Sequence, residues 1–128
     1  MQQLSDTGVD MSLSIIKPTI AEIQLAVHAN AKMKGFWDQS ANIPEKLALI
    51  HSEISEALED YRNGQPLNVL FGDTSIGEKP CGFPSELADA VIRIMDLAAF
   101  LEIDLERAIL LKHRYNLTRP KLHGGKKA

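Results

Sequence analysis

Apolar residues recur every three or four positions along most of the chain, the spacing expected of helices with one buried face. The clearest stripe, which we expect on the core side of a helix, consists of Leu47, Ile50, Ile54, Leu58 and Tyr61. No segment alternates apolar and polar residues as a half-buried strand does, and no internal repeat is present. The pattern therefore predicts an all-α fold.

Start and stop signals divide the pattern into four helices. Thr19 and Glu22 have capping-box spacing, Pro44 suits the first turn of a helix, and Asp104 is a favourable N-cap. The predicted helices span residues 19–34, 44–62, 84–101 and 105–116. We expect a helical domain over 18–120, a loose leader over 1–17 and a basic tail over 121–128.

The longest connection, residues 65–83, reads QPLNVLFGDTSIGEKPCGF. A loop of this length is unusual in a compact domain, and such loops commonly carry function.

Composition narrows the class of protein. The chain has 128 residues, 45% of them apolar, which suits one domain with a real core. Its net charge of -3 predicts neither a nucleic-acid nor a membrane partner. The single cysteine, Cys81, excludes an internal disulfide, and we treat it as chemically inert. No signal peptide or membrane-spanning stretch is evident, so we expect a cytoplasmic protein.

Acidic side chains are placed unusually on two of the predicted helices. Glu53, Glu56 and Asp60 share one flank of the second helix, and the polar positions of the third form one strip: Glu86, Asp89, Arg93 and Asp96. Consecutive helices usually pack antiparallel, which would bring the two sets together. Converging carboxylates need a cation, and hard oxygen ligands suit Mg²⁺ or Mn²⁺. The alternative is that both strips simply face water.

Other metal centres do not fit this sequence. A di-iron carboxylate site needs Glu-x-x-His on two helices, and no histidine here has a glutamate three residues before it. Zinc is disfavoured by the single cysteine and the lack of paired histidines.

Basic residues collect after the last acid of the chain. All 17 acidic residues precede residue 107, whereas 112–127 contains six lysines and arginines. Because Mg²⁺ in proteins usually shares phosphate oxygens, we expect Lys112, Asn116 and Arg119 to contact phosphate. Lys126 and Lys127 are interpreted as a solvated tail.

Two segments, SEISEALEDYR and GFPSELADAVIRIMDLA, resemble the MazG-like all-α nucleoside triphosphate pyrophosphohydrolases. The family signature, Glu-x-x-Glu followed by Glu-x-x-Asp, falls on Glu53, Glu56, Glu86 and Asp89. The segments HANAKMKGFWD and KHRYNLTRPKLHGGKK are also similar to parts of such proteins. The resemblance covers roughly residues 20–126, and the 65–83 loop is long for this family.

The resemblance implies a four-helix fold in a homodimer or homotetramer with sites near subunit interfaces. It also implies Mg²⁺-dependent attack of water on the α-phosphate of a nucleoside or deoxynucleoside triphosphate, giving monophosphate and pyrophosphate. The expected role is nucleotide-pool house-cleaning. The 65–83 loop would line the base pocket or act as a lid.

The residue roles follow from this resemblance. The four signature acids are the expected metal ligands, with Glu53 or Glu56 as the catalytic residue that orients or deprotonates water. Trp37 offers a ring on which a base can stack, and His28 and Lys34 are further substrate-binding candidates. Lys112 and Arg119 would hold the outer phosphates, and Asn116 phosphate or sugar. Asp60 and Asp96 are interpreted as surface or supporting acids, and Glu59 as solvated.

A non-catalytic function remains as an alternative. The same fold can serve as a nucleotide-sensing or dimerisation module without turnover. The presence of all four signature acids favours catalysis.

Overall fold

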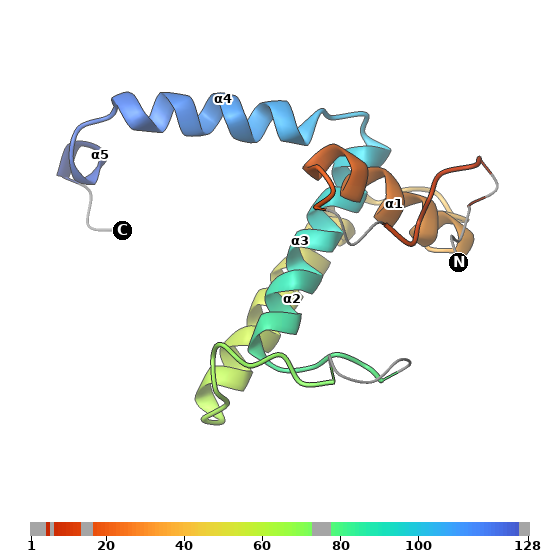
Figure 1. Ribbon diagram of the computed structural model, residues 1–128, viewed down its shortest axis with the longest axis horizontal. Helices are drawn as coiled ribbons and strands as arrows, with labels where there is room; N and C mark the ends of the chain where they lie inside the picture. The colour runs from red at the N-terminus through yellow and green to blue at the C-terminus, as the bar shows by residue number, and fades with distance from the viewer. Residues whose placement is uncertain (1–4, 6, 14–16, 73–77, 126–128) are drawn as a thin grey trace.

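The computed structural model describes residues 5, 7–13, 17–72 and 78–125. These residues form five helices: α1 (Ile20–Met33), α2 (Ile43–Arg62), α3 (Phe83–Phe100), α4 (Leu105–Thr118) and the short α5 (Leu122–Gly125) (Figure 1). The described residues contain no strand beyond an isolated bridge, so the all-α prediction is confirmed for them. The short α5 was not predicted, because its four residues lie in the expected tail.

Local sequence explains where the helices begin. Thr19 forms the predicted capping box with Glu22, and Asp104 caps α4 through the backbone N–H of Arg107. Asn42 caps α2 in the same way, so that helix begins one residue before Pro44. These caps each satisfy a backbone donor that the first turn leaves unpaired.

The body of the molecule is built from three helices. In Figure 1, α2 and α3 lie side by side and antiparallel, as predicted, and α1 packs against α3 near its carboxyl end. The core between them is small: Ala26, Ala29, Ala57, Ala90, Met95, Leu97 and Ala98 are buried. Because alanine has a small side chain, the helix backbones can approach closely along this contact.

The predicted core stripe of α2 is wrong for the single chain. Leu47, Ile54, Leu58 and Tyr61 are 48–61% exposed, whereas Glu53 and Ala57 are the buried residues of α2. The periodicity located a continuous apolar face, but α3 packs on the flank beside it. The apolar face is left uncovered by the rest of the described chain.

Helix α4 extends away from α2 and α3 (Figure 1). It is tied to the body near its start, where Glu106 Oε1 accepts a hydrogen bond from the backbone N–H of Ile20 at 3.1 Å. Most of its apolar side chains are exposed, including Leu110, Tyr115 and Leu117. One chain therefore does not complete a four-helix packing around a common core.

The long loop before α3 is closed at its base. Phe71 and Cys81 exchange two backbone hydrogen bonds, at 3.0 and 3.1 Å. Gly82 has a φ of 103°, and a Cβ there would lie 3.0 Å from both the Phe71 ring and the Val69 carbonyl oxygen. This close approach requires glycine and fixes the residue from which α3 starts. Residues 73–77 of the predicted loop lie outside the described residues, as do parts of the 1–17 leader, Lys126 and Lys127.

Among the described helices, none is long and apolar enough to cross a membrane.

Candidate metal centre and adjoining pocket

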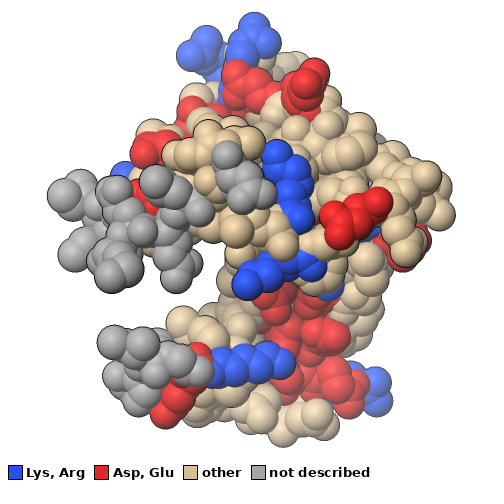
Figure 2. Space-filling model, turned by 90° about the vertical axis from the view of Figure 1, so that its right-hand side faces the viewer, with Lys and Arg blue, Asp and Glu red and all other residues tan. Residues whose placement is uncertain are grey.

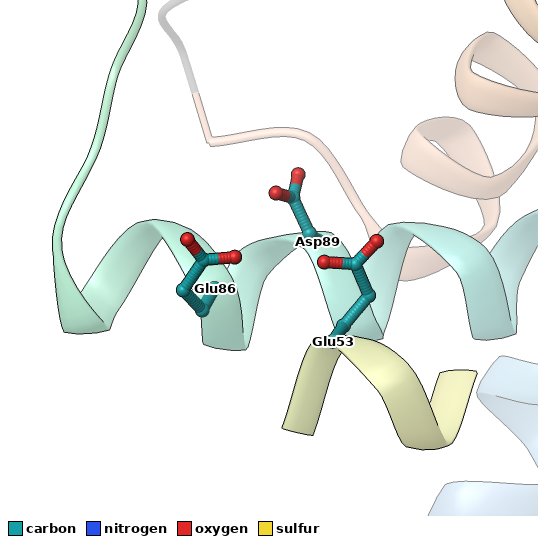
Figure 3. Close-up of side chains that lie close together, drawn as sticks. All are labelled: Glu53, Glu86 and Asp89. Carbon is teal, nitrogen blue, oxygen red and sulfur yellow. The ribbon is translucent and has the colours of Figure 1, made fainter. Parts of the chain in front are cut away.

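Three of the predicted metal ligands meet between α2 and α3. Glu53 comes from the middle of α2, and Glu86 and Asp89 from the first two turns of α3 (Figure 3). One carboxylate oxygen from each lies within 4.8 Å of the other two. The antiparallel packing of α2 and α3 thus brings together acids that are more than 30 residues apart in the sequence.

The fourth signature acid, Glu56, lies beside this triad. Partial burial, a side-chain hydrogen bond with Glu56, and repulsion from Glu56, Asp89 and Asp60 raise the pKa of Glu86 to about 7. Asp60, interpreted from sequence as a surface or supporting acid, is therefore close enough to contribute to the field at Glu86. Glu59 is exposed and pairs with Arg62 at 3.6 Å on the surface, as befits a solvated residue.

Asp89 is also perturbed. Burial and repulsion from Glu53 raise the pKa of Asp89, while the positive charges of Arg93 and Lys79 oppose the rise. Two of the acids are thus held in an environment that disfavours their charged forms.

Arg93 neutralises the most buried acid. Its Nε donates a hydrogen bond to Glu53 Oε1 at 2.6 Å, and Glu53 is only 7% exposed. A buried carboxylate without a partner would be costly, and this contact offsets part of the cost of burying Glu53. Arg93 was noted from sequence as part of the polar strip of α3 but was not predicted to act in the site.

The donor set fits a divalent cation. The ligand atoms are carboxylate oxygens, the hard donors that such ions prefer. Burial and repulsion from neighbouring acids together raise the pKa of Glu86, and a bound cation would relieve that repulsion. Asp60 Oδ2 is buried and accepts no hydrogen bond from any described residue, so a further oxygen beside the cluster lacks a partner. The cluster of Glu53, Glu86 and Asp89 can hold a metal ion.

A pocket of about 950 Å³ adjoins the cluster. Glu53, Asp89 and Arg93 line one part of it, and Trp37 and Asp96 line another. In Figure 2, acidic side chains gather beside a notch in this face of the molecule, directly below a group of basic side chains. The volume is within the range of about 300–1,000 Å³ typical of small-molecule sites.

Asp96 organises the aromatic end of the pocket. Its carboxylate accepts hydrogen bonds from Trp37 Nε1 at 2.9 and 3.1 Å and lies 2.7 Å from His28 Nδ1. His28 itself does not line the pocket; its ring meets the Trp37 ring edge-on, with centroids 5.7 Å apart. The sequence suggested a surface or supporting role for Asp96, and the structure gives it the supporting one.

The ring of Trp37 is covered on both faces. Phe100 stacks on it with ring centroids 4.1 Å apart, and the Lys46 ammonium lies 4.3 Å from the centroid. Because Phe100 occupies one face at contact distance, Lys46 lies over the other. Lys46 lines the pocket, whereas Lys34, the lysine chosen from sequence, is exposed and does not.

The predicted phosphate-binding residues lie apart from the acids. Lys112, Asn116 and Arg119 belong to the distal part of α4 and its end, and α4 extends away from α2 and α3 (Figure 1). The Lys112 ammonium and the Arg119 guanidinium lie 5.3 and 5.9 Å from the ring of Tyr115. The three residues form a group, but one chain does not bring that group to the acids.

Comparisons of the chain with protein-family models, with curated proteins and with solved structures found no match.

Proposed function

We propose that this protein is a Mg²⁺-dependent nucleoside triphosphate pyrophosphohydrolase with a MazG-like arrangement of helices. The observation that carries the proposal is the convergence of the signature acids beside a nucleotide-sized pocket. Glu53, Glu86 and Asp89 would hold the ion, which Mn²⁺ could replace, and Glu56 stands next to Glu86. A cytoplasmic role in cleaning the nucleotide pool belongs to the same proposal.

In this reaction, water attacks the α-phosphorus and the bond to the oxygen bridging the α- and β-phosphates breaks. The products are a nucleoside monophosphate and pyrophosphate. A bound Mg²⁺ would supply charge neutralisation at the phosphates and a lower pKa for coordinated water.

Glu56 is the better candidate for the group that takes the proton from water. It is exposed, and it lies outside the triad whose oxygens are within 4.8 Å of one another. Glu53 is buried and already accepts a hydrogen bond from Arg93, which suits a fixed ligand. A general base needs access to its proton donor, which favours Glu56.

The aromatic end of the pocket would receive the base. Trp37 is held by Asp96, so its ring is fixed in orientation. Stacking of a base on Trp37 would require Lys46 to leave the ring face that it covers. Lys46 would then be available to a phosphate or to a polar edge of the base. Lys34 is a weaker candidate, because it does not line the pocket.

A second copy of the chain would complete the site. The uncovered stripe of α2 and the apolar residues of α4 are exposed apolar surfaces, which in a stable protein are typical of subunit interfaces. A homodimer or homotetramer would cover them. The α4 of a partner could also bring its Lys112, Asn116 and Arg119 toward the acids, which α4 does not do within one chain.

The test is a panel of normal and modified nucleoside and deoxynucleoside triphosphates, with Mg²⁺ or with EDTA. We expect Mg²⁺-dependent release of pyrophosphate and monophosphate in equal amounts, measured by chromatography. Release of orthophosphate instead would place the attack at another phosphorus. No release by folded protein that binds Mg²⁺ would favour the non-catalytic sensing or dimerisation function.

Substitutions in the cluster test the site. Glu53→Gln and Asp89→Asn should each lower the rate by more than the roughly 10–100-fold typical of residues that only support a ligand. Glu59→Gln is the matched control, because Glu59 lies on the same helix but is exposed. Unchanged rates in Glu53→Gln or Asp89→Asn would refute the assignment of the site.

A further inference from the structure

Arg93 has donor capacity beyond its contact with Glu53. The hydrogen bond to Glu53 Oε1 uses Nε. Among the described residues, none accepts a hydrogen bond from the two terminal nitrogens of Arg93. Its side chain is 39% exposed, whereas that of Glu53 is 9% exposed, so the guanidinium reaches from a buried acid to solvent.

The exposed end of Arg93 belongs to the pocket. Arg93 lies one helical turn after Asp89 on α3 and lines the same cavity as Glu53 and Asp89. Among the described residues lining this cavity, the basic ones are Arg93 and Lys46. Lys46 lies at the aromatic end, over Trp37. Arg93 is thus the lining cation that directly contacts the acid cluster.

We propose that Arg93 binds substrate phosphate with its terminal nitrogens while its Nε holds Glu53. The proposal rests on the proposed function and deepens it, because it adds a phosphate ligand from within the same chain. The guanidinium is planar, with donors on several edges, so one edge can serve a carboxylate and another a phosphate. Lysine, with a single nitrogen on a flexible stem, cannot reproduce this geometry.

The alternative is that Arg93 only fixes Glu53. Phosphate binding at a saturated metal site separates the two roles. If Arg93 only fixes Glu53, its loss should weaken metal binding, and phosphate should bind normally once the metal site is saturated. If Arg93 also binds phosphate, phosphate affinity falls even when the metal site is saturated, because the terminal nitrogens no longer donate to it.

The experiment uses the full chain and two probes. Mn²⁺ binding without nucleotide is measured by electron paramagnetic resonance, and pyrophosphate binding at saturating Mg²⁺ by calorimetry. The Mn²⁺ titration gives the metal concentration that saturates each variant, and for Arg93→Met at saturating metal we expect pyrophosphate affinity lower by about 10–100-fold, the effect of losing hydrogen bonds to a charged group. A pyrophosphate affinity within about threefold of wild type would overturn the inference, since so small a change is below one charged hydrogen bond.

A second variant keeps the test valid if Arg93→Met does not fold. Arg93→Lys keeps the charge but cannot span Glu53 and phosphate together, so pyrophosphate affinity should still fall by about tenfold. Arg62→Met is the matched control, because Arg62 also pairs with a glutamate of α2 but is exposed and does not line the pocket. It should change neither affinity. If the wild-type protein binds no Mn²⁺, the proposed function itself is refuted. If wild type binds both probes and the Arg93 variants bind pyrophosphate with unchanged affinity, only this inference is refuted.

Discussion

The partial burial of Glu86 and the crowding of acids around it predict an inverse dependence of stability on pH in metal-free protein. Glu86 titrates at about 7 in the folded chain, against 4.5 for an unperturbed glutamate. Between these values the unfolded state has released its proton and the folded state has kept it. The unfolded state then binds fewer protons, so the free energy of unfolding falls as pH rises from about 4.5 to about 7.

The size of this change in stability follows from the difference between the pKa values of Glu86 in the unfolded and folded states. One pH unit is worth about 1.4 kcal/mol for a single group, so a fully developed shift of this size would cost about 3 kcal/mol. Glu86 is half-buried, and solvent screening reduces our expectation to about 1 kcal/mol. A divalent cation should reverse the trend, because it binds the deprotonated acids and competes with the proton. Its stabilising effect should therefore be larger at pH 8 than at pH 5.

Urea denaturation in EDTA at several pH values between 5 and 8, at fixed protein concentration, measures this dependence. Glu86→Gln removes the titrating group and should flatten the curve relative to wild type, which isolates the contribution of Glu86. Wild type and Glu86→Gln with the same slope would refute the reasoning. So would a stabilisation by Mg²⁺ that does not grow with pH.

Three further predictions test the surroundings of the site. Asp96→Ala should lower the free energy of unfolding by about 1–3 kcal/mol, because the Trp37 and His28 nitrogens lose their acceptor; chemical denaturation measures the loss, and an unchanged midpoint would contradict it. Trp37 fluorescence should change when nucleotide is added with Ca²⁺ in place of Mg²⁺, and constant emission despite calorimetric binding would place the base elsewhere. Leu58→Glu should shift the assembly toward the mass of one 14.2 kDa chain in sedimentation equilibrium, since it charges an exposed apolar stripe; an unchanged mass would exclude the stripe from the interface.

Helix positions could be predicted from the sequence because their signals are local. The Thr19 capping box and the Asp104 cap each involve residues within one turn, and both are present in the structure. Which face of each helix is buried against another helix could not be predicted from such local signals. Glu53 lies on the flank beside the apolar stripe that contains Leu58, and only the packing of α3 decides that Glu53 is the buried residue.

The residues of the candidate site could likewise be predicted only in part. The sequence predicted that Glu53, Glu86 and Asp89 lie close together, because antiparallel packing of two consecutive helices brings acids on their flanks together, and the structure has them so. It did not identify Arg93 as the partner of Glu53, although Arg93 lies in the same polar strip of α3. The reason is physical: the sequence gives the helix face, whereas the choice between a solvated arginine and an ion-paired one depends on the neighbouring helix.

The alanines between the helices have a consequence for ion size. Ala57 follows Glu53 by one turn, Ala90 follows Asp89 directly, and both are buried. Their small side chains set how closely α2 and α3 approach, and therefore the space between carboxylates that belong to different helices. Mg²⁺ needs oxygens at about 2.0–2.1 Å and Ca²⁺ at about 2.3–2.6 Å, so a widening of well under one ångström distinguishes them. Residues that contribute no ligand atom would thus select the ion, and a valine at either alanine should shift the preference toward calcium.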